Sequence, residues 1–359
     1  MLSIKKPQGI FRMGWMALPS LLAIALLSLP ASAQRVAVTN LTSDITNAAS
    51  VMDPDLVNPW GLSISPGGPW WVSDNGTGLS TLYNSSGQNQ GLIVTIPSGS
   101  GSGTGSPSGT VYNGTSGFKI NGQVAAFLFC TEDGTISGWY GGSTAYIAVN
   151  NNGNGAVYKG MALASQGGAN YLYVANFNAG TVEAYDTNFA PHSFGSNAFV
   201  DTTLPAGYAP FNVQLVGSKL VVTYAKQDAA KHDDVPGQGF GYVDIYDTAG
   251  NLSLRLAHNV YLNAPWGVVQ APANFGGFSN ALLIGNFGNG AISAYNITTG
   301  VFIGSFFDVN DLPLKLDGLW ALAFGNGGSG GPTTTLYFTA GPFNENHGIF
   351  GSIVPVSGP

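Results

Sequence analysis

The sequence is poor in cysteine and in charged residues, and each shortage excludes a class of protein. A single cysteine, Cys130, cannot form an internal disulfide, so packing and topology must stabilise the fold. Charged residues are only 8% of the chain and hydrophobic residues are 44%, which excludes a highly charged, disordered protein. The formal net charge is −7, so we expect no nucleic acid and no anionic membrane as a partner.

Apolar runs long enough to span a membrane are also missing. The best candidate, Met16–Pro30, is 15 residues long, whereas a spanning helix needs about 20. It follows three basic residues and precedes the small residues Ala31–Ala33, which is the pattern of a cleaved secretory signal peptide. We therefore predict a signal peptide at residues 1–33 and a mature domain at residues 34–359. The mature protein is expected to be a periplasmic or extracellular monomer without stable membrane insertion.

Glycine is abundant, at 52 residues, and it recurs in short phrases with aromatic residues, Asn and Thr. One phrase places glycine at its second position, then an aliphatic residue, and in most copies ends in Tyr-Asn or Tyr-Asp. Six copies occur at intervals of 46 to 61 residues, beginning at Thr77, Asp133, Ala179, Phe240, Asn289 and His347. Apolar runs lie before and after each copy, so each unit is predicted to form about four short antiparallel strands.

A four-stranded unit repeated six times predicts an all-β fold, the six-bladed β-propeller. One such sheet cannot bury both of its faces, whereas the neighbours in a closed ring cover one another. The last unit leaves little chain for a fourth strand, and the strand-like segment Arg35–Asp44 has no unit of its own. We expect this N-terminal segment to supply the outer strand of the sixth blade. Two β-sandwiches are the alternative, which repetition over the whole length disfavours.

Several phrases resemble known proteins. The openings "NPWGL" (58–62) and "NAPWGV" (263–268) resemble NHL-type propeller repeats. Longer phrases, such as "TEDGTISGW" (131–139) and "YFTAGPFNENHGIFGSI" (337–353), are similar to an uncharacterised family of exported bacterial proteins, and the similarity covers about residues 36–353. The resemblance implies a β-propeller and export, and it implies no particular reaction.

An aromatic residue stands near the start of the predicted first strand in several units. The first strand of each blade lines the axis of a propeller, so Trp60, Phe211, Trp266 and Trp320 are expected near the centre. They would form either a stacking surface for a sugar or another flat ligand, or part of the packed core, which is the commoner role of such residues.

The second predicted strand of several units ends in acidic or amide residues. Corresponding turns converge on one mouth of a propeller, and carboxylate and amide oxygens suit a calcium-type divalent ion. The alternative for each residue is a turn cap that accepts nearby backbone N–H groups. The candidate metal ligands are Asp74, Asn75, Glu132, Asp133, Asn176 and Asn286. The candidate ligand-binding residues are Trp60, Lys226, Asp228, Trp266 and Trp320.

A long loop in the fourth unit, Lys226–Gly239, concentrates charge in a chain that otherwise has little. Within it, His232 and Asp234 are candidate acid–base or metal-binding residues with Asp233 between them, and the pair of His347 and Glu345 in the last unit would reach the same mouth. A solvated loop whose charges pair with one another is the alternative. The other two histidines, His192 and His258, fall in outer-strand regions and are expected to be structural.

Two functions fit these observations. The lack of a strong catalytic constellation favours an extracytoplasmic binding or scaffold module that recognises a small molecule, a glycan or a protein at the channel mouth. The polar turns, with His232 and His347, favour the alternative of a calcium-type metal-dependent hydrolase, lactonase or lyase. Matches to G-x-S-x-G and G-x-G-x-x-G within Gly325–Gly331 belong to one glycine-rich turn, so they predict neither a nucleophile elbow nor a nucleotide site.

Overall fold

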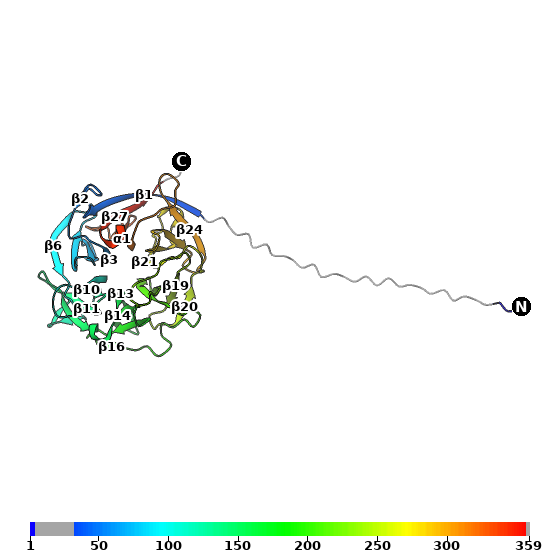
Figure 1. Cartoon of the computed structure of the whole chain (residues 1–359), viewed down its shortest axis with the longest axis horizontal. Helices are drawn as coiled ribbons and strands as arrows, with labels where there is room; N and C mark the ends of the chain where they lie inside the picture. Colours follow the sequence, from blue (N-terminus) through cyan, green and yellow to red (C-terminus); the bar gives the residue numbers. More distant parts are fainter. Residues whose placement is uncertain (4–31, 357–359) are drawn as a thin grey trace. The chain divides into compact units, whose positions relative to one another are not determined.

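The computed structural model describes residues 1–3 and 32–356, and its described secondary structure is almost entirely β. The all-β prediction is confirmed. The predicted signal peptide falls almost wholly outside the described residues. The strands of residues 32–356 form sheets that follow one another around a ring (Figure 1). No helix among the described residues has both the length and the hydropathy of a membrane-spanning segment.

Four sheets are separate, antiparallel and four-stranded, and they follow the chain in order. The first contains β3 (Pro59–Ile64), β4 (Trp70–Asp74), β5 (Leu79–Tyr83) and β6 (Asn89–Thr95). The second contains β7 (Pro107–Tyr112), β10 (Phe127–Thr131), β11 (Thr135–Trp139) and β12 (Tyr146–Asn150), with the hairpin β8 (Lys119–Ile120) and β9 (Gln123–Val124) inserted. The third contains β13 (Tyr158–Gln166), β14 (Ala169–Asn176), β15 (Thr181–Tyr185) and β16 (Pro191–His192). The fourth contains β17 (Tyr208–Val216), β18 (Lys219–Lys226), β19 (Gly241–Tyr246) and β20 (Leu252–Arg255).

A nine-stranded sheet holds two further sets of four. One set is β21 (Pro265–Gln270), β22 (Leu282–Asn286), β23 (Ile292–Tyr295) and β24 (Phe302–Phe307). The other is β25 (Leu319–Phe324), β26 (Leu336–Ala340), β27 (Ile349–Pro355) and β1 (Ser32–Ser43), and β2 (Val51–Met52) pairs with β1. Short helices complete the description: η1 (Asn152–Asn154), η2 (Gly276–Phe278) and α1 (Pro342–Glu345).

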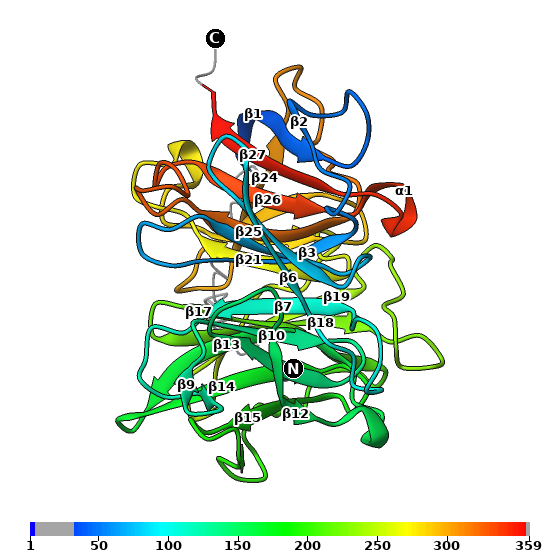
Figure 2. The same ribbon diagram turned by 90° about the vertical axis from the view of Figure 1, so that its left-hand side faces the viewer.

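Strand β1, the first strand of the described chain, lies between strands from the last two sets. Its first residues pair in parallel with β24, and Val36–Ser43 pairs antiparallel with β27 (Figure 2). Val36 is fully buried and packs in one cluster with Phe338 and Ile353 of the last set. The predicted place of the N-terminal segment beside the last strand is therefore confirmed.

The middle strands are buried on both faces because neighbouring sheets cover them. In β4, Trp70 and Trp71 are adjacent in sequence and point to opposite faces, as in any strand. Trp70 contacts Tyr337 of the last set, with ring centroids 5.0 Å apart, and Trp71 stacks on Phe127 of the second sheet at 4.0 Å. The two neighbouring tryptophans therefore pack this sheet against the sheets on both of its sides.

Glycines let the inner strands approach closely at the axis. A Cβ atom on Gly61 would lie 2.5 Å from the Ser108 carbonyl oxygen, and one on Gly267 would lie 2.6 Å from that of Trp320. Such contacts are too short for any side chain, so glycine is required. The tryptophan before each of these glycines packs into the centre, where Trp60 stacks on Trp320 at 3.6 Å. The recurring Pro-Trp-Gly phrase thus builds the packed axis of the ring.

Candidate binding site at one mouth of the ring

The centre of the site is Lys159, whose side chain is only 1% exposed. It precedes Gly160 near the start of β13, the position that Trp60 holds in β3 and Trp266 holds in β21. Its ammonium lies 5.0 Å from the ring centroid of Trp60 and 5.7 Å from that of Phe177. A charged group has therefore replaced an aromatic residue in the buried layer at the axis, where it makes cation–π contacts.

Two carboxylates compensate this buried charge. Lys159 forms ion pairs with Glu132, from the turn after β10, and with Asp233, from the loop between β18 and β19, the latter at 3.3 Å. Burial alone would lower the pKa of Lys159, but the two carboxylates outweigh burial and raise it. Burial likewise would raise the pKa of Asp233, but Lys159 and His232 lower it. The amine is therefore charged, and Asp233 is its anionic partner.

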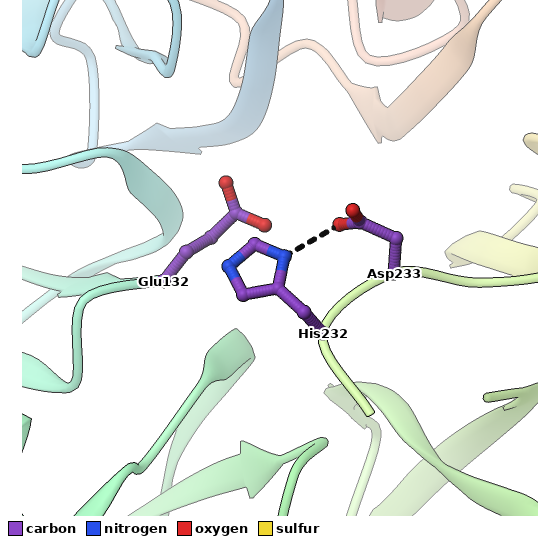
Figure 3. Close-up of side chains that lie close together, drawn as sticks. All are labelled: Glu132, His232 and Asp233. Atoms are coloured by element: carbon purple, nitrogen blue, oxygen red, sulfur yellow. Dashed lines mark hydrogen bonds and ion pairs between the residues drawn. The ribbon is translucent and has the colours of Figure 1, made fainter. Parts of the chain in front are cut away.

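His232 extends this cluster toward solvent. Its Nδ1 atom lies 2.8 Å from Asp233 Oδ1 (Figure 3). Glu132, His232 and Asp233 each offer a ligand atom, and these atoms all lie within 4.8 Å of one another. The donors suit a divalent ion, but the ammonium of Lys159 already contacts both carboxylates. An ion bound among them would have to compete with that charge.

Amide side chains continue the polar belt across neighbouring sheets. Asn75 Nδ2 donates to Glu132 at 2.7 Å, and Asn58 Nδ2 donates to Glu345 at 2.7 Å and to Asn75 at 3.3 Å. The indole N–H of Trp320 donates to Asn58 Oδ1 at 3.0 Å. The belt therefore draws on turns from the second sheet, the first sheet and the last set of strands.

Asp234 is the group best suited to proton transfer. Its Oδ2 atom is buried and has no hydrogen-bond partner among the described residues. Burial raises the pKa of Asp234 to about 7, an effect that Lys159 opposes and Glu345 reinforces. Burial also raises the pKa of Glu345. A carboxyl group that titrates near neutral pH can act as either acid or base.

Successive residues of a strand point to opposite faces, so the predicted metal ligands fall into two groups according to their distance from the strand end. Asp74, Asn176 and Asn286 are the last residues of β4, β14 and β22, and they are buried within their own sheets. Each accepts hydrogen bonds from backbone or hydroxyl groups near its turn, the capping role expected as the alternative. Asn75 and Glu132, one residue beyond the strand end, join the polar belt instead.

The remaining polar candidates lie outside the belt. Asp133 accepts backbone N–H groups from Gly99 and Ser106, so it orders the glycine-rich loop of the second sheet. Lys226 Nζ lies 4.2 Å from the ring centroid of Phe240. Asp228 accepts the backbone N–H of His232 at 2.9 Å and thereby shapes the long loop.

The last-unit histidine and the tryptophans have other partners. His347 Nδ1 lies 2.7 Å from Asp44 Oδ2, so its ring contacts the segment after β1 and does not join the belt. Trp60, Trp266 and Trp320 are buried against one another. Their rings offer no exposed stacking surface, and their packing matches the core alternative.

Sequence reasoning missed two members of the cluster, Asn58 and Lys159. It named Asp233 and Glu345 only as neighbours of His232 and His347. A signal for Lys159 was present, because it stands before glycine where other openings carry tryptophan. No comparable signal marks Asn58, which contacts Glu345 across 287 positions of the chain.

Comparison with known proteins gives two curated relatives of similar length. Uncharacterized protein R648 of Acanthamoeba polyphaga mimivirus is 30% identical over 334 residues, which cover 88% of this chain and 79% of that protein. Uncharacterized protein L690 of the same virus is 31% identical over 338 residues, covering 88% and 85%. No family model matches the chain. Because these relatives are viral, they lend no support to the expected bacterial origin.

Solved structures share the architecture. Virginiamycin B lyase from Staphylococcus aureus aligns with a TM-score of 0.51 and 10% identity over 90% of this chain and 99% of the lyase. The calcium-binding protein regucalcin from Agrobacterium tumefaciens aligns with a TM-score of 0.53 and 13% identity over 92% and 97%. At such low identity the likeness establishes the β-propeller fold alone.

Proposed function

Since the chain belongs to one family with the mimivirus proteins R648 and L690, we propose a function for it from its own residues: it is an exported propeller that binds a polar, hydroxyl-rich small molecule at the mouth around Lys159. Six blades are supported by the four separate sheets and the two sets of four strands in the nine-stranded sheet. Export is supported by the pattern of residues 1–33. The likeness of the Pro-Trp-Gly openings to NHL-type repeats stays a prediction.

The observation that carries this proposal is the buried ion pair between Lys159 and Glu132. A buried ion pair commonly stabilises a protein no better than well-packed apolar residues of the same volume. Trp60 and Trp266 provide such packing at the corresponding positions of other sheets. A lysine retained there is better explained by recognition than by stability.

The chemistry of the mouth suits hydroxyl groups. Carboxylate oxygens of Glu132 and Asp233 accept O–H donors, and the Asn75 amide can donate to hydroxyl oxygens. The buried Lys159 ammonium holds the two carboxylates in place. Asp233 has a side chain that is 66% exposed, so a ligand reaches it from solvent. Carboxylates outnumber basic groups here, which disfavours anionic ligands. A neutral sugar or polyol fits this balance.

Calorimetric titration with neutral monosaccharides and disaccharides tests the proposal. We expect saturable binding by at least one sugar, and Glu132→Gln and Asp233→Asn should each weaken it about tenfold, the loss of roughly one charge-assisted hydrogen bond. Asp133→Asn, which changes a carboxylate outside the belt, is the matched control and should bind as the wild type does. Binding that survives both mouth substitutions would overturn the proposal.

A metal-dependent hydrolase, lactonase or lyase is the second candidate. It is favoured by Glu132, His232 and Asp233, whose ligand atoms lie within 4.8 Å of one another, and by the pKa of Asp234, about 7. A calcium-type ion would stabilise the folded protein by mass action, so chelation would lower Tm by several degrees. Metal analysis of the purified protein, together with melts in calcium and in chelator, tests this function. No bound metal and no Tm change would exclude it.

A further inference from the structure

A cavity of about 410 Å³ is lined by residues of β15 and β16, the outer strands of the third sheet. Strand β16 lies at the rim of the ring (Figure 1). The cavity exists because the outer strand is short. Strand β16 has two residues and pairs only with Ala184 and Tyr185 of β15. The earlier part of β15, Thr181–Glu183, extends beyond it, and Val182 and Glu183 line the cavity. The volume lies in the range of small-molecule sites.

The carboxylate of Glu183 is held in place by three donors. Tyr158 and Tyr185 donate their hydroxyls to Oε2 at 2.8 and 2.7 Å, and Asn176 donates to Oε1 at 2.6 Å. Tyr158 is fully buried and Tyr185 is nearly so. Burial raises the pKa of both phenols, so both hydroxyls keep their protons and donate. Each of the three groups donates to a carboxylate oxygen, so the orientation of the Glu183 side chain is fixed.

No ion pair forms at Glu183 among the described residues, and no lysine or arginine lines the cavity. Aromatic side chains form much of its wall instead: Tyr185, His192, Phe194 and Phe199. Of these, Phe194 stacks with Tyr173 at 5.8 Å and so is anchored to the sheet. The carboxylate lies on one face of the third sheet with Tyr158 and Tyr185, whereas Phe194 and Phe199 pack with Tyr173 on the other face. The cavity spans the open edge of β15 between the two faces. A carboxylate without a counter-charge that shares one cavity with aromatic side chains attracts an organic cation.

We infer that this cavity binds a small organic ammonium ion, with the cationic head beside Glu183 and its methyl or methylene groups against the aromatic walls. The site is independent of the sugar-binding function proposed for the mouth. His192, expected from the sequence to be only structural, contributes a wall of this site. The uncharged side chains of the cavity provide apolar contacts with the ligand. The charge of Glu183 makes the site selective for cations.

Choline is the probe, and its uncharged isostere 3,3-dimethyl-1-butanol is the matched control ligand. In calorimetric titrations of the full mature protein at low salt, we expect choline to bind with a Kd on the order of 1 mM or below. The neutral alcohol should bind at least about tenfold more weakly, because it lacks the cation–π and charge contributions. Equal binding of the two ligands, or no saturable choline binding, would overturn the inference.

Two substitutions complete the experiment. Glu183→Gln keeps the shape and most hydrogen bonds but removes the charge, so we expect about a tenfold loss in choline affinity. Asp311→Asn removes an exposed carboxylate outside the cavity and should leave choline binding unchanged. Choline affinity that is unchanged in Glu183→Gln, or lost in Asp311→Asn, contradicts a rim site. The comparison of the two ligands on the wild type decides the question even where Glu183→Gln does not fold.

Discussion

In the folded protein, two carboxylates and two aromatic rings replace the water that would otherwise hydrate the Lys159 ammonium. Glu132 is itself largely buried, at 11% side-chain exposure, so each charge depends on the other for compensation. Removing one partner of such a pair leaves an uncompensated buried charge, which is far more destabilising than removing both.

Lys159→Met should therefore lower the free energy of unfolding by about 3 kcal/mol or more, because Glu132 loses its counter-charge. The double variant Lys159→Met with Glu132→Gln should recover a large part of that loss. Urea titrations followed by tryptophan fluorescence measure both. A single variant as stable as the wild type would show that the two charges do not depend on each other.

Asp234 predicts a pH dependence of stability. Its pKa in the folded protein is about 7, above its ordinary value of 3.8, so between these values the folded state holds a proton that the unfolded state has lost. Stability must then fall as pH rises from about 4 to about 7. This contribution is on the order of 2–4 kcal/mol.

Asp234→Asn should remove that part of the pH dependence. We expect the variant to be more stable than the wild type at pH 8 and about equal to it at pH 4, because the amide resembles the protonated acid. Denaturant titrations at several pH values measure the difference between the two proteins. A constant difference across this range would contradict the raised pKa.

At the scale of the strand, the inner glycines set the spacing between sheets. Gly61→Ala would place a methyl group 2.5 Å from the Ser108 carbonyl oxygen, and backbone cannot move aside easily. We expect a loss of about 1–3 kcal/mol from overpacking. Gly153→Ala is the matched control, since a Cβ there meets nothing within 4 Å, and it should change stability by less than about 0.5 kcal/mol. Thermal unfolding compares the two, and similar melting temperatures would argue against close approach at the axis.

The sequence predicted strands better than it predicted the site. Apolar runs and turn residues are local, so β4 and β22 could be recognised from Trp70–Asp74 and Leu282–Asn286 alone. Which residue of a turn faces the axis depends on where the strand ends. Asp74 and Asn75 differ by one position, yet the first caps its own sheet and the second joins the mouth. A local pattern does not fix that difference.

Contacts between residues of different sheets are even harder to predict from local sequence patterns. Lys159 meets Asp233 across 74 positions of the chain, because the start of β13 and the loop between β18 and β19 converge at the axis. Within the loop Lys226–Gly239, His232 contacts the carboxylate of Asp233, but the same carboxylate also reaches Lys159 of the third sheet. Contacts of this kind depend on the closed arrangement of the sheets and cannot be predicted from local sequence.

At the scale of the whole molecule, strand β1 should be essential for the ring. A protein that begins at Ile45 lacks the outer strand beside β27 and exposes the edge of that strand. We expect its melting temperature to be lower by roughly 10 °C or more, which thermal melts measure. Aggregation, detected by size-exclusion chromatography, is the alternative expected result. A protein that begins at Gln34 retains most of β1 and serves as the control. Similar melting temperatures would show that the strand is dispensable.

The pairing of β1 with β27 also determines when the molecule can fold. The earliest-synthesised strand finds its partner about 300 positions later, at Ile349–Pro355. Every shorter nascent chain lacks that partner and displays an open strand edge. Closure of the ring through this pairing must therefore wait until β27 has been synthesised.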